Sequence, residues 1–320
     1  MRPTTLLVLA VLASTLAAPE QAESQGRLRR PRGAAGDEGL RTLQVRGTER
    51  SYVVRAPRSA TSDATPRAMV IVLHGGGGNA ANAEAMSGFT RLVDREGIIV
   101  VYPNGSGRPG GRLLTWNAAH CCGFAMENRV DDVGFIDTMI DAIGREFNVD
   151  PRRIYVTGMS NGGMMAHRLG RELRHRPAAI APVVGAVFGD EAMPSSPVSA
   201  VIFNGLKDTS VPAAGGLGDG IGRRAWDGVP PRPNAEQGAY WARAAACGAT
   251  PATRDANGVI HWTWPCGNGV AVELYQVKEG GHAWPGGRAG RRRGDDPGST
   301  LDATDVMWAF FKAHPRTTDD

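Results

Sequence analysis

A serine in a glycine-flanked turn is the feature of the sequence that points most directly to chemistry. The pentapeptide Gly158-Met-Ser-Asn-Gly162 lies between residues 153–158, a predicted strand, and a predicted helix that begins at Asn161. A tight strand-to-helix turn exposes a serine hydroxyl. It needs small residues two positions before and after the serine, because a Cβ there would meet the neighbouring chain. Glycine is common here, 43 of 320 residues, so the pentapeptide could occur by chance. Its position between a predicted strand and a predicted helix is what makes it informative. We predict that Ser160 is a nucleophile.

A serine nucleophile needs a general base, and the base needs an acid that orients it. On a scaffold with this turn, the acid and then the base follow the serine along the chain. Among the seven histidines, His282 fits this order, because its glycine-rich loop comes directly after the apolar strand expected at Val270–Val277. His261 also follows Ser160, but it begins an alternating His-Trp-Thr-Trp segment typical of a strand. We therefore predict His282 as the base.

The acid is expected in the loop that follows another apolar strand. Asp208 lies just beyond the run Ser199–Asn204, so it can orient the imidazole of His282. Asp190 and Glu191, after the preceding strand, are the alternatives. An aspartate that only caps the turn before the next proline is a competing interpretation of Asp208.

A glycine-rich turn completes the chemistry. The apolar strand Ala68–Leu73 leads directly into His74-Gly-Gly-Gly-Gly-Asn79. Backbone N–H groups can approach a developing oxyanion there without side-chain obstruction. We expect the donors to be the N–H of Asn161 and one from Gly75 or Gly76. No Gly-Lys-Ser or Gly-Lys-Thr follows, so a phosphate-binding loop is disfavoured, and His74 is expected to be structural.

Together these segments resemble the secreted esterase family that groups polyhydroxybutyrate depolymerases with feruloyl and acetylxylan esterases. The resemblance covers residues 42–314, and Asn204 departs from it where the family often has histidine. It implies an α/β-hydrolase fold, with a mainly parallel twisted sheet flanked by helices on both faces in a single domain, residues 42–315. The matching segments are Leu73–Asn79, Tyr102–Gly105, Trp116-Asn117, Cys121-Cys122, Val130–Ile136, Val156–Met165, Gly205–Pro212 and Gly281–Gly287.

The N-terminus is typical of an exported protein. Residues 1–22 combine a positively charged start, a short apolar run and small residues, as a secretory signal peptide does. Residues 23–41 are rich in Arg, Gly and Pro and are expected to be a disordered leader. No later segment is long and apolar enough to cross a membrane, so we expect a secreted protein, extracellular or periplasmic, without a membrane anchor.

The rest of the chain alternates between strand and helix patterns, which predicts a mainly parallel sheet. An antiparallel pair is expected over Leu43–Ala56. The later strands are expected at Ala68–Leu73, Ile98–Tyr102, Arg153–Gly158, Ala179–Val187, Ser199–Phe203 and Val270–Val277. Helices are expected near Ala80–Glu96, Asp131–Phe147, Asn161–Leu173, Ala235–Ala246 and Ala303–Ala313.

Four cysteines in an exported chain suggest two disulfides. Cys247 and Cys266 flank a segment between a helix and a strand, so we pair them, which leaves Cys121 with Cys122. Adjacent cysteines lack the spacing of a zinc site, and neither a metal nor another cofactor is expected.

Two tryptophans are candidates for substrate contacts. Trp116 and Trp284 lie in the predicted active-site loops, where an exposed ring could stack on sugar or phenolic groups, and core packing is the alternative. A net charge of +4 and the run Arg291–Arg293 could steer the protein towards acidic polymers, although such a run is commonly a solvated loop. Nucleic acid is not an expected partner of an exported protein.

These residues predict a serine carboxylesterase that acts on short-chain or aromatic esters through a Ser-His-Asp triad and an acyl-enzyme. The expected partner is a small or oligomeric ester, including esters on polysaccharide or a polyester. A serine peptidase of the same fold is one alternative, and a non-catalytic exported binding protein on a hydrolase scaffold is another.

Overall fold

The computed structural model describes residues 1, 39–108, 111–218, 225–267, 269–290 and 294–317. Apart from Met1, the predicted signal peptide lies outside the described residues, as do most of the predicted leader and the run 291–293. The leader was predicted to extend to residue 41, but this boundary is wrong. Leu40 and Arg41 already belong to the first strand, where they pair with Val53 and Tyr52.

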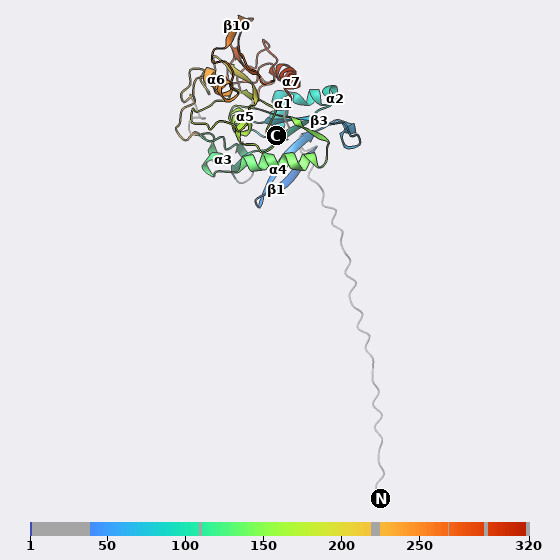
Figure 1. The fold of residues 1–320 in the computed structure, drawn as a ribbon. Coiled ribbons are helices and arrows are strands. Elements are labelled where there is room, and N and C mark those ends of the chain that lie inside the picture. Colours follow the sequence, from blue (N-terminus) through green and yellow to red (C-terminus); the bar gives the residue numbers. More distant parts are fainter. Residues whose placement is uncertain (2–38, 109–110, 219–224, 268, 291–293, 318–320) are drawn as a thin grey trace. The chain divides into compact units, whose positions relative to one another are not determined.

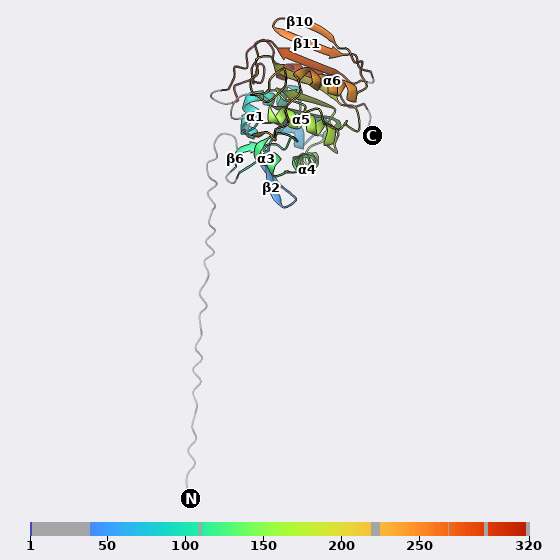
Figure 2. The ribbon, with the colours of Figure 1, turned by 90° about the vertical axis from the view of Figure 1, so that its left-hand side faces the viewer.

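The described residues form a ten-stranded sheet whose centre is parallel, as predicted. Its six central strands run parallel to one another, and an antiparallel pair flanks them at each edge. Figure 2 shows the two edges, with the β10–β11 hairpin far from β2. In spatial order the strands are β1 (Leu40–Val45), β2 (Thr48–Arg55), β4 (Ile99–Pro103), β3 (Arg67–Leu73), β7 (Val149–Met159), β8 (Ala179–Val183), β9 (Ser199–Gly205), β12 (Val272–Val277), β11 (Val259–Trp264) and β10 (Ala252–Ala256).

Helices cover both faces of this sheet. Because successive strand residues point to opposite sides, neighbouring residues of one strand pack against different helices. Ile71 of β3 lies in the apolar cluster of α4 (Asp132–Gly144), α5 (Asn161–Glu172) and α6 (Asn234–Ala244). Its neighbour Val70 lies in the cluster of α1 (Ala80–Ser87) and α7 (Ala303–Ala313), which Figure 1 shows close together. Among the described residues, no helix combines the length and apolarity needed to span a bilayer.

The expected helix over 80–96 is interrupted. Gly88 ends α1 with a left-handed φ of 65°, a 3-10 turn follows, and α2 resumes at Val93. The strand expected to reach residue 187 ends at Val183. The helix α2 spans Val93–Glu96. The structure also contains short elements that were not predicted, namely β5 (Ser106–Arg108), β6 (Arg112–Thr115), α3 (Gly123–Glu127), η1 (Arg58–Thr61), η2 (Phe89–Leu92) and β10.

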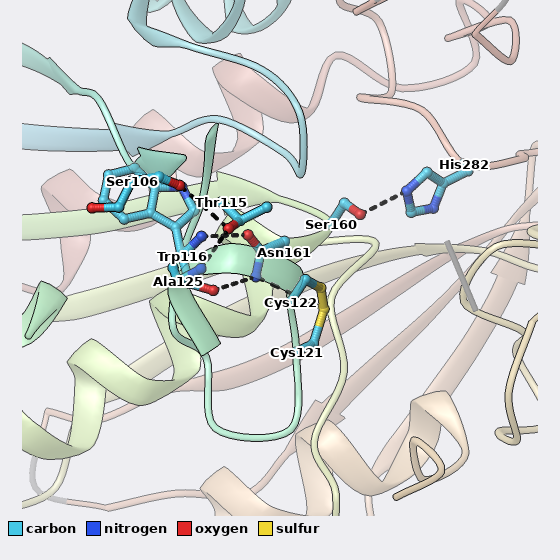
Figure 3. Close-up of a disulfide and its surroundings, with 9 residues drawn as sticks. All are labelled: Ser106, Thr115, Trp116, Cys121, Cys122, Ala125, Ser160, Asn161 and His282. Atoms are coloured by element: carbon cyan, nitrogen blue, oxygen red, sulfur yellow. Dashed lines mark hydrogen bonds between the residues drawn. A yellow bond between two sulfur atoms is a disulfide. The ribbon is translucent and has the colours of Figure 1, made fainter. Parts of the chain in front are cut away.

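Both disulfides have the predicted partners. Cys247, just after α6, is bonded to Cys266, just after β11, and the link closes the segment that carries the β10–β11 hairpin. Cys121 and Cys122 are bonded to each other immediately before α3. Both cysteines of this second pair are buried, next to the start of α5 (Figure 3).

Candidate active site

The turn between β7 and α5 holds Ser160 in a backbone conformation that few residues adopt. Its φ is 57° and its ψ is −121°, and its N–H donates to the carbonyl of Val183 at 2.8 Å. A Cβ at Gly158 would lie 2.6 Å from the carbonyl oxygen of Gly162, and one at Gly162 would lie 2.5 Å from that of His74. The predicted requirement for small residues on both sides of the serine is therefore met by close backbone contacts.

The structure brings Ser160, His282 and Asp208 together in one line of hydrogen bonds. Figure 3 shows the hydrogen bond between Ser160 and His282, in which Nε2 lies 2.8 Å from Ser160 Oγ. His282 Nδ1 lies 2.7 Å from Asp208 Oδ2. The other oxygen of Asp208 accepts the N–H groups of Ser210 and Val211, each at 2.8 Å. The carboxylate therefore accepts Nδ1–H and leaves Nε2 free to accept the serine proton.

The alternative acid and base candidates lie elsewhere. His261 is on β11, and its Nε2 is 2.9 Å from Glu273 Oε2 on β12. The carboxylate of Asp190 contacts His120 Nε2 at 2.8 Å, and Glu191 accepts the N–H of Gly189 at 2.8 Å. The described contacts bring none of these groups to Ser160.

The glycine-rich turn after β3 lies against Ser160 and Asn161. A Cβ at Gly75 would lie 3.6 Å from the Cβ of Ser160, and one at Gly76 would lie 3.7 Å from the Cβ of Asn161. Gly77 donates its N–H to the carbonyl of Leu114 at 2.7 Å. Within the described part of the chain, the N–H groups of Gly75, Gly76 and Asn161 have no hydrogen-bond acceptor.

His74 is a structural residue of this turn, as expected. It is fully buried, its Nδ1 lies 2.7 Å from the carbonyl oxygen of Gly75, and its Nε2 accepts the N–H of Gly105 at 2.9 Å. Burial lowers the pKa of His74 to about 4. The ring is therefore neutral near pH 7, with its proton on Nδ1.

The prediction that Trp116 and Trp284 form a substrate-binding wall is wrong. Both side chains are almost completely buried, with 0% and 1% exposure. The indole N–H of Trp116 donates to the carbonyl of His74 at 3.0 Å, and that of Trp284 donates to Thr304 Oγ1 at 3.0 Å. Trp284 also packs edge-on against Phe89. Each ring supports an active-site loop from beneath, so neither reaches a ligand.

Sequence reasoning missed Asp295, which fixes the loop of His282. Its Oδ2 accepts the backbone N–H of His282 at 2.6 Å and lies beside Gly281. The two residues are thirteen positions apart, and no spacing or hydrophobic pattern links them. Only the folding of the loop after residue 293 places this carboxylate next to the base.

A buried ion pair lies below the loop that contains Trp116. Asp132, the first residue of α4, accepts from Arg50 at 2.7 Å and from the N–H of Asn117 at 2.8 Å. Burial raises the pKa of Asp132 although Arg50 lies beside it. The neighbouring Asp131 caps α4 by accepting the N–H of Gly134 at 2.9 Å. Asp131 and Asp132 are therefore bonded to the protein itself.

We expect the free energy of unfolding to fall steeply in mild acid. His167, like His74, is fully buried, and burial lowers its pKa from 6.5 to about 4. Between these values the folded protein binds fewer protons than the unfolded chain. The contribution of these two histidines to the free energy of unfolding is therefore complete above pH 6.5. It is lost as the pH falls from 6.5 to about 4, by about 1.4 kcal/mol per pH unit for each histidine.

Urea denaturation at half-unit steps from pH 7.5 to 4.5 measures this slope. The control is His167→Gln, because an amide can keep the contact with Gln237, now 2.8 Å from His167 Nε2, but does not titrate. We expect a shallower slope in the variant, and equal slopes would contradict the assignment.

Comparison with known proteins identifies the family. Residues 50–252 match the family model described as esterase PHB depolymerase. Feruloyl esterase B of Piromyces equi is 30% identical over 247 residues, which cover 75% of this chain and 44% of that protein. The putative esterase NocK of Nocardia uniformis subsp. tsuyamanensis is 29% identical over 269 residues, covering 77% and 74%. The match therefore spans less than half the length of the Piromyces protein.

A solved structure, the acetyl xylan esterase from Aspergillus awamori, superposes with a TM-score of 0.57 at 16% identity. The match covers 86% of this chain and 99% of that one. At this identity the likeness concerns the fold alone, which is the α/β-hydrolase fold predicted from the sequence. Since the family model matches more than half of this chain, the chain belongs to the esterase PHB depolymerase family.

Proposed function

We propose that this protein is a serine carboxylesterase that hydrolyses short-chain or aromatic esters through an acyl-enzyme. The observation that carries the proposal is the line of hydrogen bonds from Asp208 through His282 to Ser160, with the serine at a strained turn. A base within 2.8 Å of a serine hydroxyl, itself oriented by a buried carboxylate, is the arrangement that activates serine for acyl transfer.

In the proposed reaction, His282 Nε2 takes the proton of Ser160 as Oγ attacks the ester carbonyl. Asp208 stabilises the imidazolium that forms. The carbon–oxygen bond to the alcohol then breaks, and the alcohol leaves with the proton from His282. Water repeats the sequence on the acyl-enzyme, giving the carboxylic acid and restoring Ser160.

The oxyanion of each tetrahedral intermediate is proposed to bind the N–H of Asn161 and that of Gly75 or Gly76. Two observations support these donors. Both loops lie next to Ser160, and these N–H groups have no acceptor within the described residues. Gly77 is unsuited, because its N–H is bonded to Leu114.

The substrate class rests on the relatives and on the polarity of the site. The relatives' names include feruloyl esterase, acetylxylan esterase and poly(3-hydroxybutyrate) depolymerase, the last from Ralstonia pickettii. A long acyl chain needs extended apolar surface, at about 0.8 kcal/mol per buried methylene. The loop after Asp208 offers instead Thr209 and Ser210, while the apolar Val211 beside them is buried. We therefore propose acetyl, feruloyl or hydroxybutyrate esters of a sugar, polysaccharide or oligomeric polyester.

We also propose that the protein is exported. The sequence of residues 1–22 and the two disulfides support this proposal, because disulfides persist in oxidising compartments.

A series of p-nitrophenyl esters from acetate to dodecanoate, with a feruloyl ester and a hydroxybutyrate trimer, tests the proposal. We expect kcat/KM to be highest at four carbons or fewer and to fall with each longer chain. Absence of hydrolysis across the series would contradict the esterase assignment. A maximum at twelve carbons would contradict only the substrate class and indicate an apolar acyl tunnel.

A further inference from the structure

The two halves of the proposed oxyanion hole come from different strands. Gly75 and Gly76 follow β3, whereas Asn161 follows β7. The ladder between these strands extends to the pair Leu73–Gly158. Beyond it, the distance between the two donor loops depends on contacts outside the sheet.

Trp116 makes hydrogen bonds to both loops, and Figure 3 shows those to Asn161. Its backbone N–H donates to Asn161 Oδ1 at 2.7 Å, and its carbonyl accepts from Asn161 Nδ2 at 3.0 Å. Its indole N–H donates to the carbonyl of His74 at 3.0 Å, and its ring centroid lies 4.9 Å from that of His74. One buried residue thus connects the residue before Gly75 with Asn161.

The bond to His74 has a direct effect on a proposed donor. The carbonyl of His74 and the N–H of Gly75 belong to the same planar peptide unit and point in opposite directions. A donor that holds the carbonyl on one side therefore fixes the direction of the N–H on the other. On the Asn161 side, the two amide bonds hold the first residue of α5 at the turn.

Trp116 is itself held in place. Its carbonyl accepts the N–H of Cys122 at 3.1 Å, and Cys122 is bonded to Cys121. The next residue, Asn117, donates its N–H to the buried Asp132 at 2.8 Å. Because the side chain is fully buried and the loop is anchored at both ends, Trp116 has little freedom to follow a displaced donor.

We propose that Trp116 is a positioning residue of the oxyanion hole, which aligns both donors without touching the substrate. The inference rests on the proposed function. Preorganised donors act through their direction towards the developing charge, so a small misalignment lowers transition-state stabilisation more than substrate binding. The expected signature is a loss in kcat with little change in KM.

One variant tests the hydrogen bonds of Trp116 to each of the two loops. Trp116→Phe removes the bond to His74 and keeps an aromatic ring in the core. Asn161→Ala removes both amide bonds and keeps the backbone N–H. The matched control is Trp241→Phe. Trp241 is equally buried, and this change also removes an indole bond, here the one to Nδ1 of His167 in α5 at 2.8 Å.

With p-nitrophenyl butyrate we expect kcat to fall about tenfold or more in both test variants, less than the roughly hundredfold or greater loss of a whole donor. KM should stay within about twofold. The inhibition constant of phenylboronic acid, which forms a tetrahedral adduct with a serine nucleophile, should rise in proportion to the fall in kcat. Trp241→Phe should keep the wild-type kcat and inhibition constant, and its Tm should shift by about as much as that of Trp116→Phe.

Equal kcat values in Trp116→Phe and wild type, or equal losses in Trp116→Phe and Trp241→Phe, would overturn the inference while leaving the esterase assignment intact. If Trp116→Phe does not fold, Asn161→Ala decides in the same way. Full activity of Ser160→Ala would instead overturn the proposed function, and this inference with it.

Discussion

Replacing Ser160 by alanine is expected to lower kcat for p-nitrophenyl butyrate by roughly 10⁴- to 10⁶-fold, because the members of a triad act as a unit. The substitution removes the hydroxyl 2.8 Å from His282 Nε2. It leaves the backbone of the turn in place, so circular dichroism and Tm should match the wild type. Steady-state assays at high enzyme concentration measure the residual rate.

A fluorophosphonate probe gives an independent readout of the same residue. We expect peptide mapping to find the label on Ser160 in the wild type and nowhere in Ser160→Ala. Ser62→Ala is the control, because that serine is exposed and its hydroxyl, among the residues that the structure describes, bonds to the carbonyl of Ser59. Labelling of another serine, or a variant with most of its activity, would contradict the assignment of the nucleophile.

Replacing Asp132 by alanine is expected to lower the free energy of unfolding by about 3–5 kcal/mol. The change leaves the buried Arg50 guanidinium without its carboxylate, which lies 2.7 Å away, and leaves the N–H of Asn117 without an acceptor. Urea denaturation followed by tryptophan fluorescence measures the loss.

The double variant Arg50→Leu/Asp132→Leu separates the two costs of this pair. Burial raises the pKa of Asp132, so placing this charge in the interior is unfavourable even beside Arg50. Replacing both charges by apolar side chains should therefore cost less than removing one. A double variant less stable than Asp132→Ala would show that the pair itself stabilises the fold.

The sequence predicts those parts of the fold whose signal is local. The β3 strand, the elbow at Ser160 and the start of α5 each follow from a continuous run of residues with the right period or flanking glycines. The helix predicted over 80–96 is broken because Gly88 adopts a left-handed φ of 65°. A single glycine in a helical pattern does not by itself predict such a break.

The environment of the site was harder to predict, because it depends on contacts between distant loops. Trp116 and Trp284 occur in active-site motifs, but only the packed structure shows that both rings point into the core. Asp295 contacts the backbone N–H of His282 from thirteen residues further along the chain. Chemistry-bearing residues were recognisable by type and order, whereas their supports depend on tertiary packing, which a single sequence does not report.

The antiparallel hairpin at the end of the sheet has a consequence for how the protein behaves at high concentration. A free strand edge is a template on which another chain can extend the sheet. The outermost strand, β10, is almost entirely exposed, and it carries Arg254 and Asp255. Asp255 is paired with Lys278 at 2.7 Å. A second chain docking here would have to accommodate these charges, so the edge resists aggregation.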